Sequence, residues 1–312
     1  MEAKIVDAKS YKLATRNIKN IFNTMEFAEL NANKVDDVIY IIVYKDNAPR
    51  FGCIFGRNDD EWSCPFSAPF GYIEPLKKNQ TVANFEEALK EIERVAKKNG
   101  CKKMSMTLPP VFYDNDVLST WYSLMANSGW MQKYVDINFT MNINYLISNY
   151  MEKIHYNARK NLKIAEESGL IISECKSLDD RKKAYRTIKI NRETKGYLLR
   201  MTEEQVMNTI NIVPASMYGV YDNSEMVASA LVYDVTDSVA QVVYWGDIPG
   251  YQEKKVINFL AYELLKIYAD KGFQYLDIGP STEKGIPKYG LCDFKDSIGC
   301  SRTVKHYLYK DL

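Results

Sequence analysis

The sequence has few of the residues on which many catalytic and metal sites depend. It contains only two histidines, His155 and His306. A histidine-rich metal site is therefore excluded, a Ser-His-Asp or Cys-His device is disfavoured, and we expect no bound metal. The six cysteines form no CxxC pair, and each lies in or near an apolar context. This pattern is typical of reduced thiols and indicates a cytoplasmic protein.

Long apolar runs and a strong charge of one sign are also missing. No run reaches the roughly 18–20 apolar residues that cross a bilayer, and the first residues lack the basic-then-apolar pattern of a signal peptide. We therefore expect a cytoplasmic protein without integral membrane association. The 41 basic and 40 acidic residues leave a net charge of +1. This balance gives no sign of a nucleic-acid coat or membrane-surface protein.

What the sequence does contain is enough apolar material for two domains. Hydrophobic residues make up 46% of the chain and aromatic residues 12%. A chain of 312 residues exceeds one ordinary core and suits two domains of roughly 150 residues each.

The stretch 239–298 has the clearest pattern in the chain. It predicts a strand (239–246), a loop (247–253), a helix (254–271), a second strand (273–278) and a polar tail. The helix has one apolar face at a spacing near 3.6 residues: Val256, Phe259, Leu260, Leu264, Ile267 and Tyr268. Ligands of layered α/β domains usually bind beyond the carboxyl ends of the strands. Both strands end in glycine and polar residues, so we place the site there.

The first half predicts a similar series of elements. We expect a helical lead-in (11–30), strands at 38–44 and 49–56, a bent or edge strand at 62–72, a helix at 81–99 and a strand at 103–108. In the second half, strands at 217–221 and 226–233 again flank a turn. Tyr44 and Tyr221 lie 177 residues apart, and Gly100 and Gly272 lie 172 residues apart. The same order at nearly the same spacing indicates an internal duplication, with domains at 1–147 and 148–312.

Two runs resemble one known family. The sequence NARKNLKIAEESG (157–169) and the segment from Gly279 to Gly299, with its Phe294-Lys295 pair, resemble the Fem-type transferases, which build peptidoglycan cross-bridges. That family has tandem GNAT-fold domains. The resemblance implies an α/β protein with α+β mixed sheets and two tandem GNAT-like domains. It further implies transfer of an acyl or aminoacyl group to an amine of a cell-envelope or polysaccharide precursor, in a cleft between the domains.

The sequence departs from the family in two places. It has no charged coiled-coil arm, and the loop 246–251 lacks the Gln/Arg-x-x-Gly-x-Gly/Ala signature of CoA-binding GNAT enzymes. The amino end of the helix at 254–271 still offers free N–H groups to phosphate. We expect any such contact at Gly246, Gly250, Lys254 and Lys255. The donor stays open between acyl-CoA and aminoacyl-tRNA.

Three residues are candidates for the chemical step. The resemblance implies that Lys295 stabilises charge at the reacting centre, and the other interpretation is a surface lysine beside Asp293 and Asp296. Asp277 lies between Leu276 and Ile278 in a strand, where a structural hydrogen bond or a general base would explain a carboxylate. Tyr244 and its neighbour Trp245 face opposite sides of a strand, so at most one of them lines the cleft.

The candidates for substrate binding lie in two basic segments and around the strand ends. Cationic side chains would hold acceptor phosphate or carboxylate, although the basic run at 150–169 also fits a solvated helix face. The candidates are Arg159, Asn161, Arg192, Lys195, Trp245, Ser281, Lys288, Tyr289 and Phe294.

Two other classes of function stay open. One is a non-catalytic GNAT scaffold that binds an anionic sugar nucleotide or a protein partner. The missing phosphate-loop signature favours it, whereas the polar residues from Asp277 to Lys295 favour the enzyme. The other is a tRNA-interacting factor, which would need a contiguous basic surface.

Overall fold

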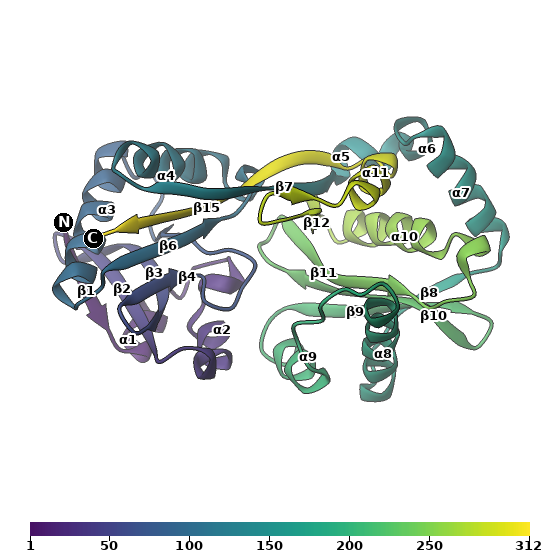
Figure 1. Cartoon of the computed structure of the whole chain (residues 1–312), viewed down its shortest axis with the longest axis horizontal. Coiled ribbons are helices and arrows are strands. Elements are labelled where there is room, and N and C mark those ends of the chain that lie inside the picture. The colour runs from purple at the N-terminus through teal and green to yellow at the C-terminus, as the bar shows by residue number, and fades with distance from the viewer. The chain divides into compact units, whose positions relative to one another are not determined.

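The structure is a computed structural model that describes all 312 residues. It divides into two compact units. Unit 1 comprises Met1–Ile137, Lys284–Ile286 and Thr303–Leu312, and unit 2 comprises Asn138–Glu283 and Pro287–Arg302. Each unit is a layered α/β structure (Figure 1).

The first part of the chain contains these elements: β1 (Glu2–Val6), α1 (Ala8–Ala14), η1 (Ile21–Asn23), α2 (Met25–Leu30), η2 (Ala32–Lys34), β2 (Asp37–Lys45), β3 (Ala48–Asn58), β4 (Glu61–Cys64), β5 (Glu74–Pro75), α3 (Val82–Lys98), β6 (Lys103–Leu108), η3 (Val111–Tyr113), α4 (Asn115–Asn127) and β7 (Met131–Asn142).

The second part contains these elements: α5 (Ile143–Leu146), η4 (Ile147–Asn149), α6 (Tyr150–Lys153), α7 (Tyr156–Glu167), β8 (Ile171–Glu174), α8 (Leu178–Thr194), α9 (Glu203–Ile210), β9 (Ala215–Asp222), β10 (Glu225–Asp234), β11 (Val239–Asp247), η5 (Gln252–Lys254), α10 (Val256–Asp270), β12 (Tyr275–Pro280), β13 (Thr282–Glu283), β14 (Ile286–Pro287), α11 (Tyr289–Ser297) and β15 (Ser301–Asp311).

The two units repeat one strand order. The strands of unit 1 follow the order β1-β2-β3-β4-β6-β15, and those of unit 2 the order β8-β9-β10-β11-β12-β7. Most neighbours are antiparallel, but β4 runs parallel to β6 and β11 runs parallel to β12. In each unit the strand beyond the parallel pair comes from the other half of the sequence. The repeat in the sequence therefore corresponds to a repeat in topology, and the predicted fold class is confirmed.

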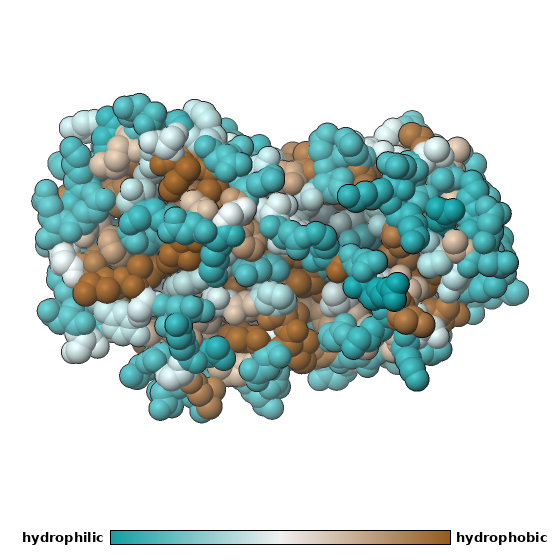
Figure 2. Space-filling model, turned by 180° about the vertical axis from the view of Figure 1, so that it is seen from behind, coloured by the Kyte–Doolittle hydropathy of each residue, from teal (hydrophilic) through white to brown (hydrophobic).

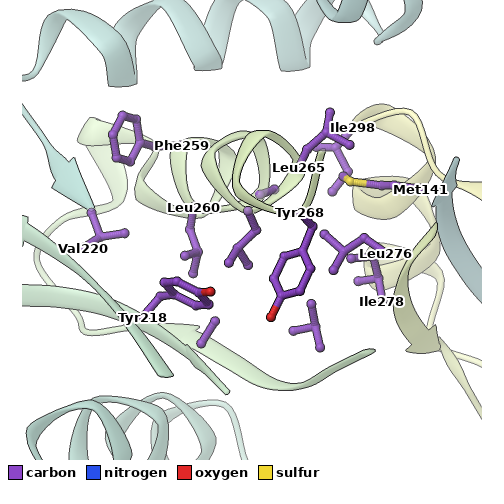
Figure 3. Packing of buried hydrophobic residues seen from close by; sticks show 14 of the residues in the cluster. Met141, Tyr218, Val220, Phe259, Leu260, Leu265, Tyr268, Leu276, Ile278 and Ile298 are labelled. Carbon is purple, nitrogen blue, oxygen red and sulfur yellow. The ribbon is translucent and has the colours of Figure 1, made fainter. Parts of the chain in front are cut away.

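Unit 2 has a large apolar core between α10 and one face of its sheet. Alternate residues of β10 and β11 face the helix because side chains alternate along a strand. Figure 3 shows Leu260, Leu265 and Tyr268 of α10 packed toward Tyr218, Leu276 and other buried side chains. Helix α7 also packs against α10, whereas α8 packs on the other face of β10 and β11. This arrangement fixes both strands that carry the candidate site.

Two of the predicted elements are wrong. The lead-in at 11–30 is not one helix, because α1 ends at Ala14 and separate capping residues, Asn20 and Thr24, begin η1 and α2. The segment at 62–72 is not an edge strand, because β4 ends at Cys64 and lies between β3 and β6. The polar tail predicted after residue 278 contains β13, β14 and α11.

The predicted boundary between residues 147 and 148 separates the two copies of a duplicated sequence, and it stays a prediction. The compact units separate instead after Ile137, since β7 and β15 each contribute residues to both of them.

Hydrophilic residues predominate on the surface seen in Figure 2, with apolar patches between them. None of the helices is long and apolar enough to cross a membrane.

Candidate active site

The parallel strands β11 and β12 of unit 2 pair only over a short stretch. Residues Val239–Gln241 pair with residues 275–277. Strand β11 nevertheless continues to Asp247 and β12 to Pro280. Beyond the paired residues, β11 and β12 are no longer bonded to each other, and side chains from another element contact their carboxyl ends.

Helix α11 supplies those side chains. Its amino end is tied to β12 because the Lys288 N–H donates to the Ser281 carbonyl at 2.9 Å. Its Phe294 ring lies edge-on to the Trp245 ring of β11, with centroids 6.3 Å apart. The helix therefore lies against both strands, and it brings Lys295 to the end of β12.

Lys295 is buried with all its ammonium hydrogens engaged. Its side chain is 5% exposed. Its Nζ donates to the carbonyls of Ile278 at 3.1 Å, Gly279 at 2.8 Å and Pro280 at 3.2 Å. Burial lowers the pKa of Lys295 to about 8, because desolvation disfavours the charged form. The interpretation of Lys295 as a surface lysine is wrong.

Asp277 is fully buried near this lysine, and its carboxylate has hydrogen-bond donors around it. Its carboxylate accepts hydrogen bonds from Asn138 Nδ2 at 2.8 Å, from Gln241 Nε2 at 2.9 Å and from the Gly279 N–H at 2.9 Å. Three donors offset much of the cost of burying a carboxylate. Its neighbours Leu276 and Ile278 lie in the apolar core.

Arg192, on α8, is the centre of a cationic and aromatic cluster. Its guanidinium lies 5.1 Å from the centroid of the Tyr244 ring and 5.8 Å from that of Tyr197. Lys288 Nζ lies 5.3 Å from the Tyr197 centroid. The Arg192 Nε is buried without a hydrogen-bond partner, and burial lowers the pKa of Arg192. A partly desolvated guanidinium of this kind is suited to an anionic ligand.

Tyr244 and Trp245 face opposite sides of β11, as the sequence predicts. Tyr244 is 9% exposed and lies against Arg192, whereas Trp245 packs against Phe294 and the apolar core. Burial raises the pKa of Tyr244, and the nearby Arg192 opposes that rise.

The remaining candidates near the strand ends differ in exposure. Ser281 is 2% exposed, and its hydroxyl has no hydrogen-bond partner. Tyr289 is 74% exposed. Lys195 forms an ion pair with Asp247 at 3.2 Å, and Lys288 forms one with Glu283 at 3.0 Å.

Arg159 and Asn161 are not brought together with Arg192. Both lie on α7, which packs with α10 on one face of the sheet, and α8 lies on the other face. Arg159 instead donates to the Ile154 carbonyl at 3.5 Å, and its Nε is buried without a partner.

The amino end of α10 is the candidate phosphate site. Lys255 takes the N-cap position with a φ of +52° and no side-chain cap, so the first N–H groups of the helix have no capping side chain. Lys254 forms an ion pair with Asp222 at 2.5 Å. Gly250, at a φ of +98°, lies in an open turn. Gly246 has a packing role, because a Cβ there would lie 2.4 Å from Asn191 Cγ.

Sequence reasoning missed two residues of this site. Gln241 and Asn138 both donate hydrogen bonds to Asp277. The available signal was a polar residue between two apolar ones in a strand, as in Ala240-Gln241-Val242. In the described chain, no group of three or more His, Cys, Asp or Glu residues is arranged to hold a metal ion.

Comparison with solved structures identifies the fold. The crystal structure of FemX superposes with a TM-score of 0.73 at 12% identity, over 100% of this chain and 98% of that one. The L-PGS of Bacillus licheniformis gives 0.63 at 11% identity, over 98% and 93%. The chain has the tandem GNAT fold. A tandem GNAT protein from the clavulanic acid biosynthesis pathway gives 0.54 at 6% identity, over 99% and 98%.

These similarities confirm the predicted resemblance in fold to Fem-type and tandem GNAT proteins. No protein-family model and no curated protein matches the sequence. The identities are low, so the assignment of an activity depends on the site itself.

Proposed function

We propose that the protein transfers an acyl or aminoacyl group from an activated donor to an amino group of a cell-envelope or polysaccharide precursor, and that unit 2 contains the transfer site. The observation that carries the proposal is the buried Lys295 ammonium at the end of β12. In a desolvated place, a fixed positive charge stabilises a developing oxyanion far better than it would in water.

The chemistry requires one exchange of hydrogen bonds. The neutral acceptor amine attacks the donor carbonyl and the new C–N bond forms. The bond to the leaving group of the donor then breaks, and the proton lost by the amine passes to the oxygen or sulfur of that leaving group. The oxyanion of the tetrahedral intermediate takes the place of one carbonyl around Lys295 Nζ. The contact with Pro280 O, at 3.2 Å, is the longest of the three and the only one that is not fully buried. It is therefore the contact that we expect the oxyanion to replace.

The Arg192 cluster gives the acceptor a place for its anionic group. A buried guanidinium with an unpartnered Nε favours phosphate or carboxylate, because charge-assisted hydrogen bonds satisfy its donors. The AcCoA named for the tandem GNAT protein from the clavulanic acid pathway supports a donor of the acyl-CoA class.

The donor is either an aminoacyl-tRNA or an acyl-CoA. The uncapped amino end of α10 supports binding of a donor phosphate.

Thermal unfolding with each donor tests the proposal. A ligand at 100 times its dissociation constant adds about 2.7 kcal/mol to the folded state, and each kcal/mol raises the midpoint by roughly 2–4 °C for a chain of this size. The donor that raises the midpoint is then incubated with amine acceptors, and mass spectrometry follows the new amide. A protein stabilised by sugar nucleotides alone, with no amide formed from either donor, would instead be a binding scaffold.

A further inference from the structure

Strand β12 departs from regular geometry just where it meets Lys295. Gly279 has a φ of +76°, and the pairing register with β7 shifts between Asp277 and Gly279. A Cβ at this position would meet no atom within 4 Å, so glycine is required by the backbone conformation and not by space. Such bulges redirect backbone and side-chain groups locally.

The bulge turns three consecutive carbonyls toward one atom. The oxygens of Ile278, Gly279 and Pro280 all accept from Lys295 Nζ. In a regular strand, successive carbonyls point alternately to opposite sides. These three carbonyls form the carbonyl cradle of Lys295, and their common orientation depends on the bulge at Gly279.

Asp277 ties this bulge to the rest of unit 2. One carboxylate oxygen accepts from both the Gly279 N–H and Asn138 Nδ2, and the other accepts from Gln241 Nε2. The aspartate thus joins β7, β11 and the irregular part of β12 at a fully buried point. It reaches Lys295 through the backbone that both residues bind.

We propose that Asp277 is a positioning residue for Lys295: its carboxylate holds the Gly279 bulge in the shape that fixes the ammonium at the end of β12, and its negative charge favours the charged lysine. Any effect of Asp277 on turnover rests on the proposed function. The effect of Asp277 on the position and charge of Lys295 does not depend on that function.

The charged and titratable groups around Lys295 support the electrostatic part. Burial is the main influence and lowers the pKa of Lys295; Cys300 after α11, Asp277 on β12 and Cys292 on α11 raise it, and Arg192 on α8 lowers it slightly. Burial raises the pKa of Cys300 to about 12, so its thiol is neutral near pH 7. Among the groups that raise the pKa of Lys295, Asp277 is the one that also binds the Gly279 bulge.

The chain offers a substitution that removes the charge and keeps the hydrogen bonds. In Asp277→Asn, the amide oxygen still accepts from Asn138 and Gly279, and the new NH₂ group faces Gln241. The Gln241 Oε1 has no hydrogen-bond partner, so a rotation of that side-chain amide supplies the acceptor. Asp277→Ala instead leaves three buried donors without an acceptor.

The test is the pKa of Lys295 in protein carrying ¹⁵N-labelled lysine, followed by NMR from pH 6 to 11. The Lys295 signal is assigned by its absence in Lys295→Met. We expect Asp277→Asn to lower that pKa by roughly one unit, the size typical of losing a nearby opposite charge. Asp296→Asn is the matched control, since it removes a carboxylate next to Lys295 in sequence that pairs with Arg302, and it should leave the pKa unchanged.

An unchanged Lys295 pKa in folded Asp277→Asn overturns the proposal. If that variant does not fold, Gly279→Ala takes its place, because it strains the bulge without removing charge and has room for its methyl group. Loss of the carbonyl cradle should lower the Lys295 pKa in Gly279→Ala, and no change would refute the positional role.

The NMR result is independent of any substrate. A protein without transferase activity can show the coupling, and an active protein without the coupling refutes only the role of Asp277. In an active protein, Asp277→Asn should also move the alkaline limb of the pH–rate profile down by the same shift as the Lys295 pKa.

Discussion

The two units have the same strand order, but they differ in how far the parallel strands pair and in which side chains lie at the carboxyl ends of those strands. In unit 1, β4 pairs with β6 along its whole length, from Glu61–Lys103 to Cys64–Met106. The loop after β4 then continues along β6, because the Gly71 N–H donates to the Thr107 carbonyl at 3.0 Å. In unit 2, the corresponding pair separates after three residues.

What lies at those strand ends differs in polarity. In unit 1 the buried neighbours are mainly apolar and aromatic, with the Phe70 and Tyr113 rings 4.6 Å apart. In unit 2 they are Lys295, Asp277 and Gln241. Buried polar groups are costly unless they are paired, so this arrangement distinguishes unit 2, the copy in which we propose the site.

The largest effect outside the reacting centre should come from Arg192. Arg192→Gln removes the buried guanidinium from the aromatic cluster, and we expect acceptor affinity to fall roughly 10- to 100-fold, as for the loss of a charge-assisted hydrogen bond. The matched control is Arg50→Gln in unit 1, since Arg50 also has a buried Nε without a partner. Calorimetric titration with the acceptor should show weakened binding in the first variant alone, and equal losses in both would contradict the comparison.

The next effect concerns the packing of α8 on β11. Gly246→Ala places a Cβ 2.4 Å from Asn191 Cγ, and we expect a loss of about 1–3 kcal/mol, as for other overpacked sites. Thermal unfolding measures it. Gly250→Ala, in open space at a φ of +98°, should cost about 1 kcal/mol through backbone strain alone. A larger loss at Gly250 than at Gly246 would show that the turn matters more than the helix contact.

The two units should respond to pH in opposite directions. Lys295 has a folded pKa of about 8, below its ordinary value of 10.5, so the unfolded chain binds more protons between these values. Stability therefore rises with pH in that window, by at most about 1.4 kcal/mol per pH unit. Denaturant unfolding should show this rise in the parent and not in Lys295→Met. A parallel pH dependence of the two proteins would rule out the buried lysine as its source.

Glu74 in unit 1 gives a response of similar size and opposite sign. Burial raises its pKa from 4.5 to about 7, and a hydrogen bond from Asn23 opposes that rise. The folded chain then holds the proton more strongly, so stability falls as pH rises from 4.5 to about 7. Denaturant unfolding of Glu74→Gln should lack this fall. If the variant retains it, Glu74 does not titrate as described.

The sequence predicts the fold where apolar periodicity determines it. The helix predicted at 254–271 is α10 (Val256–Asp270), and the strand predicted at 38–44 is β2 (Asp37–Lys45). In both, burial of one face or of a whole strand produces the pattern. Helix α11 was not predicted because it is short and polar and has glycines within and beside it. Tertiary contacts of Phe294 and Lys295 hold it in place.

The candidate site was only partly predictable for a related reason. Lys295 and Arg192 were named from the resemblance and from charge, and the structure places both in unit 2. Their surroundings depend on contacts over long sequence distances, such as Asn138 with Asp277, 139 residues away. Periodicity within one element contains no information on such pairs.

The most direct test of the account is the rate of amide formation in Lys295→Met, measured beside Lys310→Met with the donor that stabilises the protein. Lys310 is a partly buried lysine of unit 1 that pairs with Glu93. The account predicts a loss of roughly 10²- to 10³-fold for Lys295→Met, as for other groups that stabilise an oxyanion, with the fold intact and with Lys310→Met near the parent rate. A Lys295→Met protein that forms the amide at the parent rate would contradict the placement of the transfer site in unit 2.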